Sequence, residues 1–231
     1  FAQIKEDFSV PRNNDPALES NLEIIFDYPG VWAIINHRVA NRLYVNGFKK
    51  LARIYSGISQ FLTNIDIHPA CTIGRRVFLD HAFGVVIGET AIVGDDVLIY
   101  QGVTLGGVSL ERGVKRHPTI GNKTVIGSGA KILGDIKIGE NCRIGSNSVV
   151  VKSIPDDSTA VGIPARIIEK GRDKNPMAHN KIPDINKELF IYMFKRIKIL
   201  EEIIAKNHCD AKIKDDELET IYKCYLESVK E

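Results

Sequence analysis

The chain has 231 residues, a net charge of +2 and a hydrophobic fraction of 44%. These values suit one or two globular units with a substantial core, and they do not indicate a nucleic-acid-binding protein. No apolar run is long enough to cross a membrane, and the charged residues Lys5, Glu6 and Asp7 do not fit a signal peptide. Four cysteines without a CxxC pair predict neither a disulfide framework nor a zinc site, so we expect a cytoplasmic protein.

Residues 1–66 are predicted to form an α-helical cap. Asp15-Pro16-Ala17 resembles a helix start, with an acidic capping residue followed by proline in the first turn. Apolar residues at helical spacing predict a second helix after Tyr28-Pro29-Gly30 and a third from about residue 48 to 62. The apolar stripe expected on the third helix consists of Phe48, Leu51, Tyr55, Ile58 and Leu62.

Residues 67–154 repeat every six positions. An aliphatic residue opens each hexamer, and a small or medium apolar residue usually stands at its fifth position. A period of six fits neither a helix nor a long strand, and it predicts a parallel β-helix of roughly four to five triangular coils. The opening residues are Ile67, Ile73, Leu79, Ile87, Val93, Ile99, Leu105, Ile120, Ile126, Ile132, Ile138, Ile144 and Val150. We expect the β-helix domain to span residues 67–170 and its last coil to close with residues 160–168.

Two irregularities interrupt the repeat. A two-residue slip lies near Val85-Val86, and a polar excursion runs from Val108 to Pro118. A loop extruded from a solenoid usually maps to a binding face, so we expect the excursion to carry functional residues.

Residues 171–231 are predicted to form a polar linker followed by amphipathic helices. The linker covers residues 171–183, and an apolar heptad pattern then favours a helix that packs on a partner or on a copy of itself. The heptad residues are Phe190, Met193, Ile197, Leu200 and Ile204. A last helix is expected with Leu218, Ile221, Tyr222, Tyr225, Leu226 and Val229 on one face.

His81 is the candidate general base, because imidazole accepts a proton near neutral pH. Asp66, which precedes His81 by about one coil of the repeat, is a candidate to orient that ring, although an exposed corner histidine without a role fits the position equally well. Arg116 suits a bidentate grip on a carboxylate, and His117 suits donation to a developing oxyanion. A solvated loop charge is the common alternative for an arginine such as Arg116.

Asp15 and Asp80 are candidates to pair with a substrate ammonium, although a helix cap would fully explain Asp15. The string from Gly102 to Gly107 (GVTLGG) offers backbone with little side-chain bulk. It suits a long thin ligand lying along the wall of the prism, and simple corner geometry explains it equally well.

Taken together, these strings resemble the serine O-acetyltransferases of cysteine biosynthesis, over roughly residues 14–170. The matching strings are Asp15-Pro16-Ala17, His37-Arg38, Asp66-Ile67-His68-Pro69, Leu79-Asp80-His81, Gly88-Glu89-Thr90, Gln101 to Gly107, Arg116-His117-Pro118 and Val161 to Arg166. The LDH, GVTLGG and RHP strings together are specific within the larger class of hexapeptide transferases.

The resemblance implies a left-handed β-helix that transfers acetyl from acetyl-CoA to L-serine in a ternary complex. It implies His81 as the base, oriented by Asp66. Asp15, Asp80, Arg116 and His117 would hold the amino acid, and Gly102, Thr104, Gly106 and Gly107 would line the wall for CoA.

The resemblance also implies partners. Family sites form between neighbouring subunits, so a homotrimer or a hexamer is expected, with L-cysteine as a feedback inhibitor in the serine site. The printed sequence ends at Glu231 rather than at the C-terminal isoleucine with which family members dock on cysteine synthase, so that partner is not expected.

Three other functions remain open from the sequence. An acetyltransferase of the same fold acting on another small hydroxyl would have no use for Asp15, Arg116 and His117. A γ-type carbonic anhydrase needs three zinc-binding histidines, and the histidines here lack the close paired spacing. A non-catalytic scaffold would not need polar residues gathered at one corner.

Overall fold

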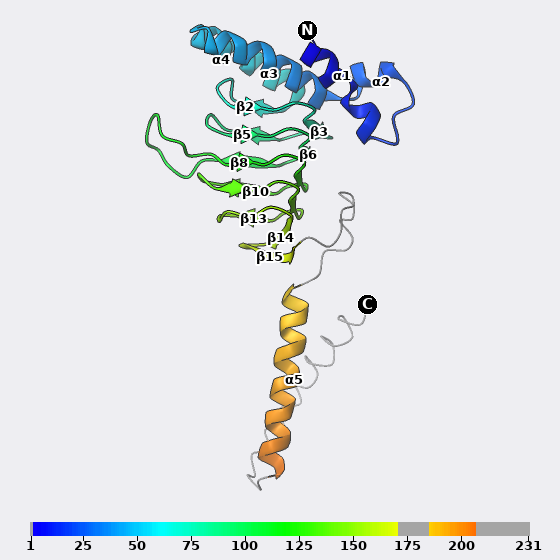
Figure 1. Ribbon diagram of the computed structural model, residues 1–231, viewed down its shortest axis with the longest axis vertical. Helices are drawn as coiled ribbons and strands as arrows, with labels where there is room; N and C mark the ends of the chain where they lie inside the picture. The colour runs from blue at the N-terminus through cyan, green and yellow to red at the C-terminus, as the bar shows by residue number, and fades with distance from the viewer. Residues whose placement is uncertain (1, 171–184, 207–231) are drawn as a thin grey trace. The chain divides into compact units, whose positions relative to one another are not determined.

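The computed structural model describes residues 2–170 and 185–206. The chain divides into two compact units, residues 1–182 and 183–231. In the first unit, helices α1 (Ala2–Asn14), α2 (Asn21–Phe26), α3 (Pro29–Val45) and α4 (Lys49–Thr63) precede a stack of short strands (Figure 1). None of the described helices is long and apolar enough to cross a membrane.

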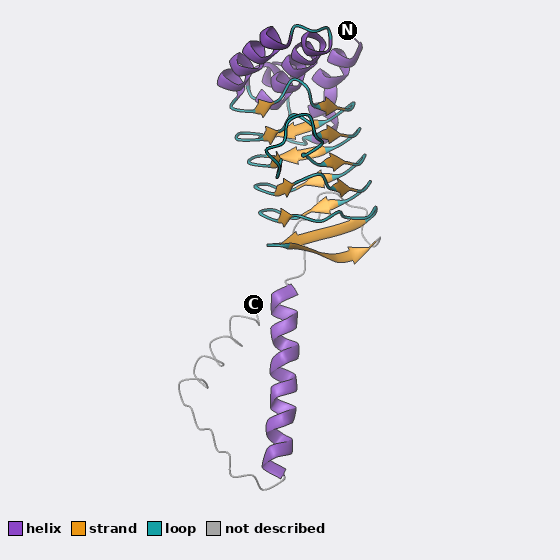
Figure 2. Ribbon diagram, turned by 90° about the vertical axis from the view of Figure 1, so that its left-hand side faces the viewer, coloured by secondary structure: helices purple, strands orange, loops and turns teal. Residues whose placement is uncertain are grey.

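The strands form a parallel β-helix with three sheets, which confirms the predicted fold class. Successive strands from β1 to β13 pass from one sheet to the next, so every third strand lies in the same sheet, and β14 and β15 both join the third sheet (Figure 2). The orders are β1-β4-β7-β10-β13, β11-β8-β5-β2 and β15-β14-β12-β9-β6-β3. The bounds are β1 Asp66–Ile67, β2 Thr72–Ile73, β3 Phe78–Asp80, β4 Val86–Ile87, β5 Ile92–Val93, β6 Leu98–Tyr100, β7 Thr104–Gly106, β8 Thr119–Ile120, β9 Val125–Ile126, β10 Lys131–Leu133, β11 Lys137–Ile138, β12 Arg143–Ile144, β13 Val149–Val150, β14 Ser158–Gly162 and β15 Ala165–Lys170.

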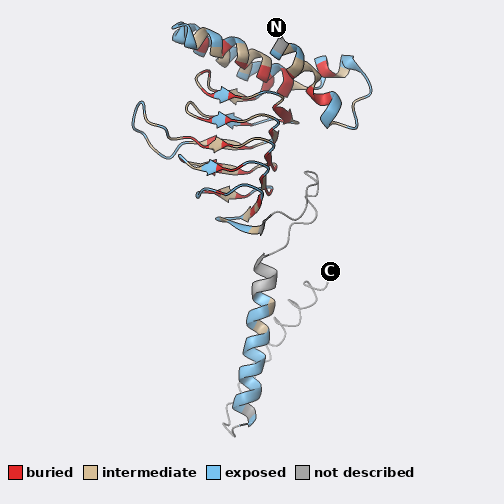
Figure 3. Cartoon of the chain, viewed as in Figure 1, coloured by how far each residue is buried: buried red, intermediate tan, exposed pale blue. Residues whose placement is uncertain are grey.

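The opening residues of the hexamers are all buried and form the core of the prism. Buried positions recur along the strands of the stack (Figure 3). Ile99, Ile126 and Ile144 stack in register from coil to coil, and each is at most 1% exposed. Burial of one such side chain stabilises the fold by about 1.5–3 kcal/mol, so the stacked opening residues of all the hexamers together supply much of the core energy. Because each coil covers the next, no single coil could retain this burial alone.

Both irregularities of the repeat appear at corners of the prism. Ile67 pairs with Ile87, and Ile87 in turn pairs with Leu105. The chain between Ile67 and Ile87 is two residues longer than the chain between Ile87 and Leu105, which matches the predicted slip. Leu105 pairs with Ile132 across a longer interval still, because the loop between β7 and β8 leaves the prism and returns (Figure 1).

Arg38 in α3 attaches the helical cap to the first coil. Its guanidinium donates to the carboxylate of Asp7 in α1 at 3.1 and 3.2 Å, and to the carbonyl oxygens of Ile73 and Gly74. The Asp7 side chain is 1% exposed, so its charge is compensated by this fork. Removal of one partner of such a buried pair costs about 3–5 kcal/mol, because the other charge is left uncompensated.

The cap differs from the sequence prediction in two respects. Asp15-Pro16-Ala17 does not start a helix, because α1 ends at Asn14 and α2 begins after Ser20, whose side chain forms a capping box with Glu23. The predicted stripe of α4 does not face the core either. Its buried residues are Ala52 and Thr63, while Phe48, Leu51, Ile58 and Leu62 are each more than half exposed.

The far end of the prism closes with a hairpin rather than a parallel coil. β15 pairs with β14 in antiparallel register, so the segment expected to complete the last coil folds back instead. In the second unit, helix α5 (Ile185–Lys206) carries the predicted heptad residues, and they are 45–54% exposed. The expected linker at 171–183 and the expected last helix at 218–229 lie outside the described residues.

His37 is buried in α3 with an unpaired ring nitrogen. Its Nδ1 atom has no hydrogen-bond partner among the described residues, and its Nε2 atom lies 3.9 Å from the Cys71 sulfur. Burial, reinforced by the neighbouring Arg38 cation, lowers the pKa of His37 to about 3. A neutral imidazole is therefore built into the junction between cap and prism.

We expect His37 to make the protein acid-sensitive. Its folded pKa lies below the unfolded value near 6.5, so its stabilising contribution is present above pH 6.5 and is lost as pH falls towards 3. Replacing it in His37→Leu removes this titration. The difference in unfolding free energy between wild type and variant, measured with urea, should change by about 2 kcal/mol between pH 7 and pH 5. Parallel pH profiles for the two proteins would contradict the assignment.

Candidate functional site

The predicted site residues fall into two groups at different corners of the prism. The first group lies where the chain passes from β3 to β4, and it contains Asp80 and His81. The second lies where the chain passes from β4 to β5 and where the long loop re-enters, and it contains Arg116 and His117. Both corners border the sheet formed by β1, β4 and β7, so the groups flank one sheet from opposite edges.

His81 stands on the irregular corner with its side chain exposed. The two extra residues of this coil place His81 at a φ of 54° and Ala82 at 31°, which turns the chain sharply after β3. The His81 side chain is 76% exposed, and its Nε2 atom lies 4.0 Å from a carboxylate oxygen of Asp80. A reactant can therefore reach this imidazole from solvent.

Asp15 and Asp80 provide negative charge on the same side of the molecule. The Asp15 carboxylate accepts a hydrogen bond from the Tyr28 hydroxyl at 2.6 Å and another from the backbone N–H of Ala17 at 2.8 Å. These bonds hold the pKa of Asp15 below its usual range. Burial raises the pKa of Asp80, and the charges of His81 and Asp15 also act on it, so the three groups are electrostatically coupled.

Asp66 does not contact His81 within the described part of this chain. It lies at the start of β1, its backbone N–H donates to the carbonyl oxygen of Val85, and its charge acts on His68 and Cys71. No hydrogen bond or ion pair joins Asp66 to His81 in residues 2–170. The orienting role of Asp66 therefore remains a prediction from sequence.

His117 is fixed by Thr90 in one tautomer. The backbone N–H of Thr90 donates to Nδ1 of His117 at 3.2 Å, so that nitrogen carries no proton. The Thr90 hydroxyl accepts from the backbone N–H groups of Arg116 and His117 and lies 2.9 Å from the same Nδ1. The remaining nitrogen, Nε2, is therefore a donor, as the predicted oxyanion role requires.

The surroundings of His117 keep its ring neutral and in place. Burial lowers its pKa, and the nearby Arg116 cation lowers it further. A Cβ atom at Gly88 would lie 2.0 Å from His117 Nε2, so only glycine leaves room for the ring. At Gly107 a Cβ atom would lie 3.1 Å from the same nitrogen.

Arg116 is held by Glu89. One guanidinium nitrogen donates to the Glu89 carboxylate at 2.7 Å, and the Arg116 side chain is 23% exposed. Other donors of the same planar fork are available for a second carboxylate, because one guanidinium carries five N–H groups. The ion pair thus presents the arginine at the corner instead of leaving it as a mobile loop charge.

The string from Gly102 to Gly107 leads from one corner to the other along β7. Gly102 adopts a φ of 69° at the corner, and its carbonyl oxygen accepts from the Lys131 ammonium. Thr104 and Gly106 pair with β10, and a Cβ atom at Gly106 would lie 2.8 Å from Leu133. These contacts account for the small residues by corner geometry and packing, and they leave the role in ligand binding a prediction.

Tyr28, Gly88 and Thr90 were not assigned roles from sequence. Gly88 and Thr90 stand in the string Gly88-Glu89-Thr90, which marked the resemblance without indicating that it supports His117. Tyr28 was assigned to a helix break, since a tyrosine before Pro-Gly carries no signal of a hydrogen-bond partner in the preceding loop. In the described residues, no group of three or more His, Cys, Asp or Glu side chains is arranged to hold a metal ion.

Comparison with known proteins relates this geometry to a family. Residues 117–152 match the family model described as bacterial transferase hexapeptide (six repeats). A serine acetyltransferase of Synechococcus elongatus is 47% identical over 203 residues, which cover 87% of this chain and 83% of the relative.

Solved structures of related proteins match the same part of the chain. A serine acetyltransferase of Neisseria gonorrhoeae in complex with serine has a TM-score of 0.69 at 41% identity, covering 73% of this chain and 68% of that one. One from Brucella abortus with coenzyme A has a TM-score of 0.70 at 43% identity, covering 74% and 68%. A serine acetyltransferase in complex with cysteine has a TM-score of 0.69 at 40% identity, covering 73% and 69%.

We expect the Thr90 hydroxyl to control the protonation of His117. Thr90→Val removes the hydroxyl, so the neutral ring loses a hydrogen bond worth about 1 kcal/mol and the pKa of His117 should rise by roughly 0.7 units. Nitrogen-15 NMR of labelled histidine measures both the tautomer and the pKa. Thr90→Ser keeps the hydroxyl and is the matched control. An unchanged His117 titration in Thr90→Val would rule out this role.

Proposed function

Because the chain belongs to the serine acetyltransferase family, we propose that it transfers the acetyl group of acetyl-CoA to the hydroxyl of L-serine. The observation that carries the proposal is the pairing of chemistries at the two corners. One corner offers an exposed imidazole beside two carboxylates, and the other offers a neutral histidine donor beside an arginine. A zwitterionic amino acid with a hydroxyl group complements these four features.

In the proposed reaction, His81 removes the proton from the serine hydroxyl as that oxygen attacks the carbonyl carbon of the thioester. The tetrahedral intermediate carries an oxyanion, which the Nε2–H group of His117 stabilises. Collapse of the intermediate breaks the carbon–sulfur bond, and the protonated His81 returns its proton to the departing thiolate. The products are O-acetylserine and CoA, and no covalent enzyme intermediate is needed.

The same arrangement supports roles for the charged groups. Arg116 binds the serine carboxylate through guanidinium donors that Glu89 does not use, and Asp15 and Asp80 attract the ammonium group. The two hydrogen bonds that lower the pKa of Asp15 keep it charged at neutral pH, as this role requires. Asp66 would orient His81, and Gly102, Thr104, Gly106 and Gly107 would form the wall along which CoA lies.

We further propose that the site is completed by assembly. In one chain the two corners lie at opposite edges of a sheet, so His81 and His117 do not meet. In a ring of three copies, one corner of each subunit would face the other corner of its neighbour, which forms three complete sites.

Because a relative binds cysteine, the proposal includes L-cysteine as a competitor for serine. The buried free thiols of Cys71 and Cys142 suit a reducing cytoplasm.

Loss of the base should remove most of the activity. His81→Ala should lower kcat with L-serine and acetyl-CoA by about two to four orders of magnitude, since general-base catalysis contributes that much. Loss of thioester absorbance follows the reaction, and the mass of the protein assembly in solution shows whether the subunits remain associated. A near-wild-type rate would place the base elsewhere. Equal turnover with an unrelated alcohol would favour a different hydroxyl substrate.

Loss of the arginine should act mainly on serine binding. Arg116→Ala should raise the KM for serine by about 10–100-fold, because a charge-assisted hydrogen bond contributes roughly 1.5–3 kcal/mol. The KM for acetyl-CoA should stay nearly constant. Arg112→Ala, an exposed arginine on the same loop, is the matched control and should leave both constants unchanged. An unchanged serine KM in Arg116→Ala would remove the carboxylate role.

A further inference from the structure

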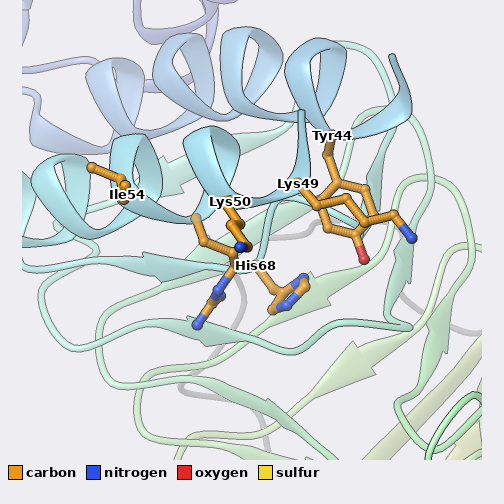
Figure 4. Close-up of a pocket in the computed structure, with 6 residues that line it drawn as sticks. Tyr44, Lys49, Lys50, Ile54 and His68 are labelled. Carbon is orange, nitrogen blue, oxygen red and sulfur yellow. The ribbon is translucent and has the colours of Figure 1, made fainter. Parts of the chain in front are cut away.

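A wide, solvent-open cavity of about 550 Å³ lies between the helical cap and the first coil, outside the two corner groups described above, and its three cationic side chains are exposed. It is lined by Tyr44 from α3, by Lys49, Lys50, Arg53 and Ile54 from α4, and by His68 after β1 (Figure 4). Its volume falls in the range of small-molecule sites. Three of the six lining residues are permanent cations and none is acidic.

The three cations are unfavourable for the helix that bears them. Lys49 and Lys50 stand in the first turn of α4, where the helix dipole is positive, and that turn contains no acidic residue. Arg53 follows Lys49 by four positions and Lys50 by three, so the like charges repel along one face. In residues 2–170 and 185–206, no carboxylate forms an ion pair with any of the three. The Tyr44 ring partly compensates Lys49. The unfavourable charges that point to a functional role are therefore those of Lys50 and Arg53.

The neutral lining residues add one ring donor and an aromatic wall. His68 accepts a hydrogen bond from the backbone N–H of Ala70 at Nδ1, with a distance of 3.1 Å, so its Nε2 carries the proton. The Tyr44 ring lies edge-on to His68 with centroids 6.0 Å apart, and the Lys49 ammonium lies 5.4 Å from the Tyr44 ring centroid (Figure 4). These edge-on and cation–π contacts form two sides of the cavity.

We propose that this cavity binds a phosphoanion, held by Arg53 and Lys50 with His68 as a neutral donor. Phosphate oxygens match a guanidinium fork and an ammonium at the same time, and they would offset the charge repulsion within α4. The phosphoanion is either a free phosphorylated metabolite or the phosphate portion of CoA. The second source rests on the proposed function, and the first does not.

His68 reports occupancy of the cavity. Burial lowers its pKa, the Arg53 cation lowers it further, and the carboxylates of Glu89 and Asp66 oppose that effect, with His117 a weaker influence. An anion beside Arg53 cancels part of this cation's effect, so the pKa of His68 should rise when the cavity fills. The readout is therefore independent of turnover.

The experiment titrates the full chain with inorganic pyrophosphate while nitrogen-15 NMR follows His68. In the wild type we expect saturable binding with a Kd below about 1 mM, weakened by salt, and a rise in the pKa of His68. Arg53→Gln and Lys50→Gln should each weaken binding about tenfold. Lys5→Gln, which removes an exposed cation from α1, is the matched control and should bind like the wild type.

The second measurement separates the two sources. If the KM for acetyl-CoA rises severalfold in Arg53→Gln, the anion is the phosphate portion of CoA; if it is unchanged while pyrophosphate binding is lost, the anion is a separate molecule. Absence of a His68 response in the wild type, together with an unchanged acetyl-CoA KM, overturns the proposal. Equal weakening in Lys5→Gln overturns it as well, since the cations would then act nonspecifically. A changed mass of the assembly in Arg53→Gln without pyrophosphate binding also overturns it, since the cations would then face a second copy of the chain.

Discussion

The structure depends on one constraint, which is that a coil of the prism cannot bury its apolar face without a neighbour. Ile99, Ile126 and Ile144 are almost fully buried only because the coils above and below cover them. The first coil has no coil above it, and there the α-helical cap takes that place. The Arg38 fork, which joins α1, α3 and the first coil, makes cap and prism one packed unit.

The sequence predicted the β-helix closely because period and burial coincide in this fold. Each aliphatic residue that opens a hexamer is buried in the prism, so the six-residue period locates the strands, the slip and the loop. The cap was predicted less well. Its helix α4 exposes Phe48, Leu51, Ile58 and Leu62, and a pattern of apolar residues alone does not distinguish a face buried within one chain from a face left exposed by it.

The candidate site was predicted as a set of residues but not as a geometry. Sequence shows that His81 lies next to the slip of the repeat and His117 at the end of the excursion, yet it does not show that one stands at each edge of the sheet of β1, β4 and β7. The supporting contacts were also hidden. The bond between Tyr28 and Asp15, and the bonds from Thr90 to the segment around His117, join residues that lie far apart in the chain and meet only through the fold.

The long loop between β7 and β8 has a consequence for how such a protein can diversify. Leu105 pairs with Ile132 in the same register that Ile87 keeps with Leu105, although the intervening chain is longer. The pairing of the strands therefore does not depend on the length of the loop between them. The loop can be extended at little cost to the prism, because the entropy of closing a loop grows only slowly with its length. Substrate preference can therefore change through this loop while the β-helix that carries the loop stays unchanged.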